Sequence, residues 1–227
     1  MKIAVLFSGR INYHKDIYDN FIDKIVIYNE VDFYLSTSPE ITNDKDLQDF
    51  IELYKPIKVI NEPINHNFDY NKYETLSCWT KSKNTCDMWF NRMRVFNLIE
   101  DKYDIILSYR LDLKSYNYMN FEINDCINIP TGSDYNGRND QMAYGNYEIM
   151  KKYMNLYLYL PEILNNCILH PEPIMKYYII NYGLKLKRFQ LLYYIMNDDN
   201  YDKDLMYGVL KKYYIIEDIL AKGLKKI

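Results

Sequence analysis

The chain has 227 residues, a formal net charge of −3 and a hydrophobic content of 48%. This length suits one large α/β domain or two small ones, and so apolar a composition excludes an intrinsically disordered chain. The slightly acidic balance argues against a broad nucleic-acid-binding surface, although it is compatible with a local basic pocket.

Four cysteines are present without a short metal-binding spacing such as C-x-x-C: Cys78, Cys86, Cys126 and Cys167. We expect free thiols in a reducing compartment, with a structural disulfide as the alternative. The first residues lack the long apolar core of a signal peptide, and no stretch approaches the roughly 18–20 apolar residues of a membrane span. The sequence therefore predicts a cytoplasmic protein without a membrane span.

Strands and helices are expected to alternate over the first sixty residues. Apolar runs predict strands at Lys2–Phe7, Val31–Leu35 and Ile57–Ile60, and helical spacing predicts helices at Asp16–Ile25 and Lys45–Tyr54. This β-α-β-α-β order is typical of a doubly wound parallel sheet. The next segment, Asn61–Ser77, has no period and is expected to be a long loop.

The turn Ser8-Gly9-Arg10 directly follows the first expected strand. Glycine lets the backbone approach a ligand closely, and many nucleotide sites begin at such a turn. An ordinary strand-to-loop glycine explains the same residues. A Rossmann dinucleotide enzyme is disfavoured, because no G-x-G-x-x-G follows the strand.

The clearest expected helix is Thr85–Glu100, which has a broad apolar face. Arg92, Arg94 and Glu100 are expected to decorate the outside of this helix. The apolar run Ile105–Leu107 comes next and suits a strand that is buried on both faces of a sheet.

This strand ends in Tyr109-Arg110-Leu111-Asp112, which places a cation and a carboxylate two residues apart. Because residues i and i+2 of an extended chain point the same way, Arg110 and Asp112 are expected to project together from the carboxyl end of the strand. Ligands bind at that end in open α/β sheets. The pair could hold a diphosphate and its metal, or it could be an ion pair that closes the strand.

The second half is expected to contain a short strand, a glycine-bounded loop and further elements. The expected elements are strands at Cys126–Ile129, Leu184–Phe189 and Leu191–Ile195, and helices at Tyr147–Leu158, Ile174–Ile180 and 204–220. The loop 134–146 carries Asp140 and Gln141 between glycines, which suits a binding site or a plain turn. Glu172 lies in a first helical turn, where an acidic residue favours the helix dipole.

The sequence resembles small glycosyltransferases of the GT-A type, including capsular and lipopolysaccharide sugar transferases and similar proteins encoded by large DNA viruses. The resemblance covers roughly residues 1–195 and lies in the order of short motifs: Phe7-Ser8-Gly9-Arg10, Asp32–Thr37, Met93-Arg94, Tyr103–Ile106, Arg110-Leu111-Asp112, Asn139–Met142 with Gly145, and His170-Pro171-Glu172. It implies one GT-A-like domain over residues 1–227, with a Rossmann-like, mostly parallel sheet flanked by helices and a helical tail from about residue 203.

The resemblance also implies a UDP- or GDP-linked sugar donor over the ends of the first strands and a glycan acceptor. The implied donor-binding residues are Phe7, Ser8, Gly9, Arg10, Ser36, Thr37, Arg94, Arg110 and Asp112. Asp140 is implied as a general base for an inverting reaction, with Glu172 as the alternative base. A retaining enzyme would use no such base.

Asp112 and His170 are implied ligands of Mn²⁺ or Mg²⁺ beside the diphosphate. The sequence departs from the family here, because Arg110 stands where the first Asp of the usual Asp-x-Asp motif is found. A guanidinium could replace part of the metal's charge, which puts metal dependence in doubt. The alternative function is a non-catalytic nucleotide- or glycan-binding module, whose tyrosines would stack on sugar rings.

Overall fold

The computed structural model describes residues 1–73 and 82–196. Contacts divide the chain into a first unit, Met1–Ile195, and a second, Met196–Ile227, and the architecture below is that of the first. Cys78, the end of the expected loop after Tyr73 and the expected helix at 204–220 lie outside the described residues. Cys86, Cys126 and Cys167 are free thiols, as predicted.

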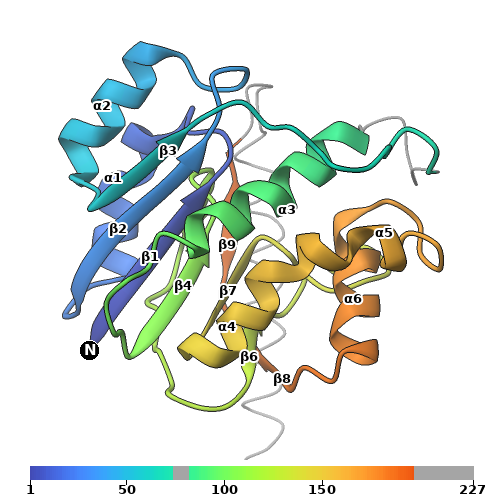
Figure 1. Cartoon of the computed structure of the whole chain (residues 1–227). Coiled ribbons are helices and arrows are strands. Elements are labelled where there is room, and N and C mark those ends of the chain that lie inside the picture. Colours follow the sequence, from blue (N-terminus) through green and yellow to red (C-terminus); the bar gives the residue numbers. More distant parts are fainter. Residues whose placement is uncertain (74–81, 197–227) are drawn as a thin grey trace, which may run out of the picture. The chain divides into compact units, whose positions relative to one another are not determined.

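A seven-stranded sheet, in the order β3-β2-β1-β4-β7-β6-β8, lies at the centre of this unit (Figure 1). Its strands are β1 Lys2–Ser8, β2 Glu30–Thr37, β3 Lys58–Asn61, β4 Ile105–Tyr109, β6 Ile127–Pro130, β7 Met142–Gly145 and β8 Leu186–Phe189. Neighbours are parallel from β3 to β4 and between β6 and β8, whereas β7 is antiparallel to β4 and β6. The predicted α/β class with a mostly parallel sheet is confirmed, and the sheet is compatible with a Rossmann-like fold.

Two strands depart from the sequence analysis. Residues 134–146 were expected to form a loop throughout, but Met142–Gly145 form β7, which pairs with β4 in the middle of the sheet. The loop prediction was therefore wrong for these four residues, which are all buried. The short strand β5, Leu113–Ser115, was not expected either, and it pairs with β9, Tyr193–Ile195, in a separate two-stranded sheet.

The helices are α1 His14–Lys24, α2 Asp44–Tyr54, α3 Ser82–Phe96, α4 Tyr147–Met154, α5 Leu160–Ile163 and α6 Pro171–Asn181, with a 3₁₀ turn at Asn155–Tyr159. Side-chain hydrogen bonds cap the N-termini of two of these helices. Asn43 accepts a hydrogen bond from the Asp46 N–H at α2, and Asn146 accepts one from the Ile149 N–H at α4. These caps pair N–H groups that have no partner inside the helix.

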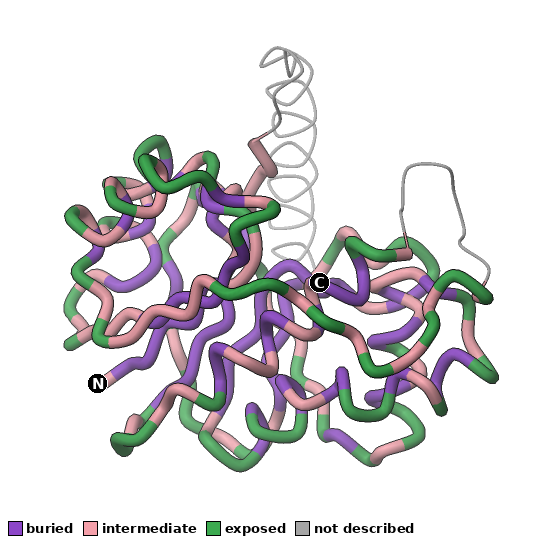
Figure 2. Tube along the Cα trace, turned by 45° about the horizontal axis from the view of Figure 1, so that its top comes forward, coloured by how far each residue is buried: buried purple, intermediate pink, exposed green. Residues whose placement is uncertain are grey.

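The helices cover both faces of the sheet, because successive side chains of a strand point to opposite sides. Leu6 packs with Trp89 of α3 in a core that extends to α4, α5 and α6, and Figure 1 shows α3 and α4 crossing in front of the sheet. Phe7 points the other way, into an aromatic cluster with Phe21 of α1 and Phe50 of α2. Burial is accordingly densest along the central strands (Figure 2). Among the described residues, no helix is both long and apolar enough to cross a membrane.

Candidate functional site

Three parallel strands end at the same level of the sheet. In the register, Phe7 of β1 pairs with Tyr109 of β4, and Ser8 pairs with Ser36 of β2. The segments that follow these strands therefore emerge as neighbours at one edge. That edge is where open α/β sheets bind their ligands.

The turn after β1 is held against the end of β2. Gly9 has a φ of +92°, which a residue with a side chain rarely adopts, and its N–H donates to the Ser36 carbonyl at 2.9 Å. Ser8 and Gly9 are half-buried and Arg10 is exposed. Phe7 is fully buried, with its ring in the aromatic cluster and its backbone between β2 and β4.

Arg94 of α3 binds the ends of β2 and β3 together. Its guanidinium donates to Ser36 Oγ at 3.1 Å, to the Thr37 carbonyl at 2.7 Å and to the Glu62 carbonyl at 3.1 Å. It also donates to Asn91 Oδ1, a partner that the sequence analysis missed. Arg94 thus positions the end of β2 and keeps one positive charge at this edge.

Arg110 and Asp112 form a two-point ion pair in the turn after β4. Nε and Nη2 of Arg110 donate to the two carboxylate oxygens of Asp112 at 2.9 and 2.5 Å. The two side chains meet as predicted, although residues 110–112 form a turn and not the extended strand end that the prediction assumed. Burial alone would lower the pKa of Arg110, but the Asp112 carboxylate outweighs it and raises that pKa. The side chains are 36% and 22% exposed, so a ligand can reach this pair.

Asp140 is buried beside a cation that the sequence analysis placed on the outside of its helix. Nη2 of Arg92 lies 3.4 Å from Asp140 Oδ2 and also donates to the Asp140 carbonyl. Arg92 is only 2% exposed, and its guanidinium lies over the Trp89 ring at 4.5 Å from the centroid. The expectation that Arg92 decorates the helix surface was therefore wrong. Burial is possible because the guanidinium is paired and stacked.

His170 and Glu172 contact each other at the start of α6. His170 Nδ1 lies 2.6 Å from Glu172 Oε2, at angles that do not make a hydrogen bond. Burial raises the pKa of Glu172 to about 7, helped by the Asp140 carboxylate and opposed by Arg110 and Arg92. Burial lowers the pKa of His170, and Asp140 opposes that shift. Both shifts favour the neutral form of the side chain.

The candidate site is the set Arg110, Asp112, Asp140, His170 and Glu172, together with the Ser8–Arg10 turn. The electrostatic influence of Arg110 and Asp140 on Glu172 joins three of these elements. Tyr193 of β9 adds a further side chain, because Asn139 donates to its hydroxyl at 2.6 Å. No local sequence signal marks Arg92, Asn91 or Tyr193 as members of this region, since each is recruited by a partner far along the chain.

The predicted metal ligands are engaged with other side chains. Among residues 1–73 and 82–196, no group of three His, Cys, Asp or Glu side chains is arranged to hold a metal ion. Both oxygens of Asp112 accept from Arg110, and His170 faces Glu172. The residues fit Mn²⁺ or Mg²⁺ only as one carboxylate that supplements phosphate oxygens and water, which is a common arrangement for Mg²⁺.

No protein family and no curated protein matches this sequence. The geometry of the site and the order of the sequence motifs therefore carry the functional proposal below.

Gly137 brings the loop 134–141 against the start of α6. A Cβ on Gly137 would lie 1.9 Å from the carbonyl carbon of Glu172 and 2.3 Å from the Pro173 nitrogen. Gly137→Ala is therefore expected to push this loop away and to lower the free energy of unfolding by about 1–3 kcal/mol. Urea denaturation measures this, with Gly183→Ala as a control that adds backbone strain but no close contact. If Gly137→Ala lowered the free energy of unfolding by less than Gly183→Ala does, the close contact between this loop and the start of α6 would be contradicted.

Glu172 is expected to make stability depend on pH. Between its ordinary pKa of 4.5 and about 7, the folded protein keeps a proton that the unfolded chain has released. The free energy of unfolding should therefore fall by about 3 kcal/mol as pH rises through this window and level off above it. Denaturation of the natural chain and of Glu172→Gln at pH 4 and pH 8 isolates this contribution. Parallel pH profiles for the two proteins would show that Glu172 titrates normally.

Proposed function

We propose that the protein is a glycosyltransferase that moves a sugar from a UDP- or GDP-linked donor to a hydroxyl of a glycan or a protein-linked sugar. The observation that carries the proposal is the partly exposed Arg110–Asp112 pair at the carboxyl end of β4, one strand from the Gly9 turn. A ligand-binding edge that offers a planar guanidinium and a carboxylate suits a nucleoside diphosphate. The parallel half of the sheet supports the GT-A-like character of the domain.

Arg110 is proposed to bind the diphosphate of the donor. Its fork now holds two carboxylate oxygens, and two phosphate oxygens can take their place with the same geometry. That exchange frees Asp112 for a ribose hydroxyl or for Mn²⁺ or Mg²⁺. When bound, the cation would share the charge of the leaving diphosphate with Arg110.

Of the two proposed bases, Glu172 has the pKa that suits the role. A pKa of about 7 lets a carboxylate accept a proton near neutral pH, as general base catalysis requires. Asp140 is held by Arg92 and contributes negative charge that favours proton uptake by Glu172. In an inverting reaction, the acceptor hydroxyl gives its proton to Glu172. The oxygen of the acceptor hydroxyl bonds to the anomeric carbon of the donor sugar as the bond between that carbon and the diphosphate breaks.

Turnover of nucleotide sugars tests this proposal. The full chain is incubated with UDP- and GDP-sugars, Mn²⁺ or Mg²⁺ and a panel of glycan acceptors, and released UDP or GDP is measured. The natural chain and Glu100→Ala, which removes an exposed carboxylate, should release nucleotide, and Asp112→Ala should not. Saturable donor binding without release would instead indicate the non-catalytic module. Absence of both binding and release would refute the proposal.

A further inference from the structure

A hollow of about 440 Å³ opens at the edge of the sheet opposite the candidate site. It is bordered by Met1 before β1, by the turn Ile27–Asn29 before β2 and by the segment Tyr118–Phe121. Because β1 has seven residues, the two edges lie roughly 20 Å apart at ~3.3 Å per residue. The hollow is therefore separate from the Arg110–Asp112 pair.

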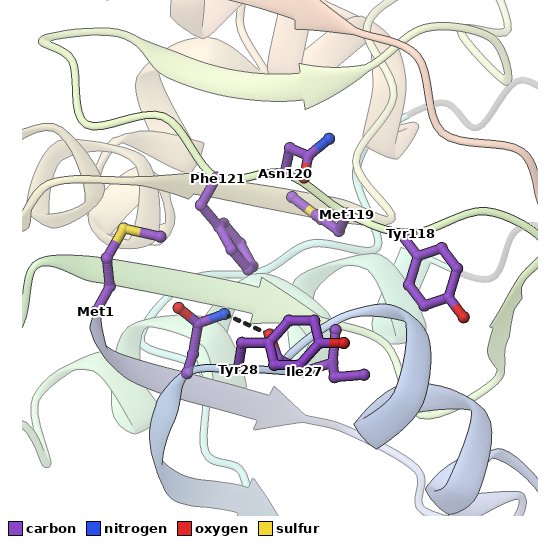
Figure 3. Close-up of a pocket in the computed structure, with 8 residues that line it drawn as sticks. Met1, Ile27, Tyr28, Tyr118, Met119, Asn120 and Phe121 are labelled. Atoms are coloured by element: carbon purple, nitrogen blue, oxygen red, sulfur yellow. Dashed lines mark hydrogen bonds between the residues drawn. The ribbon is translucent and has the colours of Figure 1, made fainter.

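Tyrosine rings are displayed at the rim of the hollow. Tyr28 is 94% exposed and Tyr118 is 54% exposed, whereas most large apolar side chains of the described residues lie in the core. Figure 3 shows Phe121 extending toward the turn that carries Tyr28. The ammonium of Lys24 lies 3.8 Å from the centre of the Tyr118 ring, which limits the motion of that ring before any ligand arrives.

The backbone of Tyr28 provides a second, independent observation. Its φ is +67°, in the left-handed region that is unfavourable for a residue with a bulky side chain. The side chain is almost fully exposed, so packing in the free protein does not compensate for this strain. The turn sets this conformation, because the Asn29 N–H donates to the Val26 carbonyl at 3.1 Å, and it leaves the Tyr28 ring exposed at the rim.

The lining chemistry points to one class of ligand. The eight lining side chains are uncharged, and the α-ammonium of Met1 is the single formal charge that these residues bring to the hollow. Asn29 and Asn120 supply amides beside the rings, and Met119 supplies an apolar surface. A neutral sugar ring offers the matching combination of an apolar face and hydroxyl groups. The volume is within the roughly 300–1,000 Å³ of small-ligand sites.

We infer that this hollow is a carbohydrate-binding site, remote from the proposed donor site, that takes a neutral oligosaccharide. The inference is independent of the proposed glycosyltransferase activity, because it needs neither donor nor turnover. If both hold, the hollow would retain a glycan that the other edge of the sheet modifies.

The test is binding of the labelled full chain to an array of defined neutral and charged glycans, without nucleotide. Calorimetry then gives the Kd of the strongest neutral oligosaccharide. Tyr28→Ala and Tyr118→Ala should each weaken it about tenfold or more, as expected for an exposed aromatic anchor. Tyr147→Ala, at a partly exposed tyrosine of α4, should leave the Kd unchanged.

Tyr28→Gly separates a binding role from a structural one. Glycine adopts a φ of +67° without steric strain, so this variant should keep or raise the melting temperature while losing the oligosaccharide. A lower melting temperature would show that the ring stabilises the fold. The inference would be overturned if the natural chain bound no glycan. It would also be overturned if all variants bound the oligosaccharide as tightly as the natural chain.

Discussion

Replacing Arg92 with methionine is expected to lower the free energy of unfolding by about 3–5 kcal/mol. Arg92 is 2% exposed and is the buried cation that faces the Asp140 carboxylate. Methionine fills part of the volume over the Trp89 ring, but it leaves a buried carboxylate without its partner. Urea denaturation at neutral pH measures the loss.

The double variant Arg92→Met with Asp140→Asn shows whether the pairing causes that loss. Removing both charges together should be less harmful than removing the cation alone, because no buried carboxylate is left unpaired. A double variant no more stable than Arg92→Met would contradict this explanation. A loss of less than about 1 kcal/mol in the free energy of unfolding of Arg92→Met would also contradict it.

Replacing Asp112 with asparagine is expected to reduce donor turnover by at least about a hundredfold and to leave the fold intact. The carboxylate is proposed to hold the ribose or the cation at the diphosphate, and removal of one electrostatic contact to a reacting group often has an effect of this size. Stability should change little, because the pair with Arg110 is partly exposed and such pairs contribute only about 0–1 kcal/mol. Nucleotide release and melting temperature are the two measurements.

A matched control removes a different carboxylate of a partly exposed ion pair. Asp49 accepts from Lys15 at 2.5 Å on the surface of α2, and Asp49→Asn should keep full turnover. Arg110→Lys adds a further comparison, since lysine keeps the charge but loses the planar fork. It should weaken diphosphate binding about tenfold. Full activity in Asp112→Asn would remove the main support for the proposed role of this edge.

The strands that end at the proposed donor site could be predicted because their signal is local. Lys2–Ser8 and Ile105–Tyr109 are apolar runs in the sequence and buried parallel strands in the fold. β7 was missed for a physical reason. Its four residues, Met142–Gly145, have no period of their own, and they are buried because β4 and β6 pair with them from both sides.

The site residues also divide into those that local sequence predicts and those that it does not. Arg110 and Asp112 are two residues apart in the turn after β4, so the local chain alone brings them within reach of each other. Arg92 and Asp140 are separated by 48 positions, and no periodicity shows that they meet. A charged residue on a helix is usually exposed, and Arg92 is buried only because a distant carboxylate arrives beside it. Local patterns thus predict the edge, and only the folded chain reveals which side chains support it.

A crystal structure of the protein soaked with UDP or GDP and Mn²⁺ tests the central claim most directly. We expect the diphosphate beside Arg110, with the Arg110–Asp112 pair opened and the nucleoside near the Gly9 turn. Nucleotide bound at another place with that pair intact, or no nucleotide at saturating concentration, would contradict the assignment of this edge as a donor site.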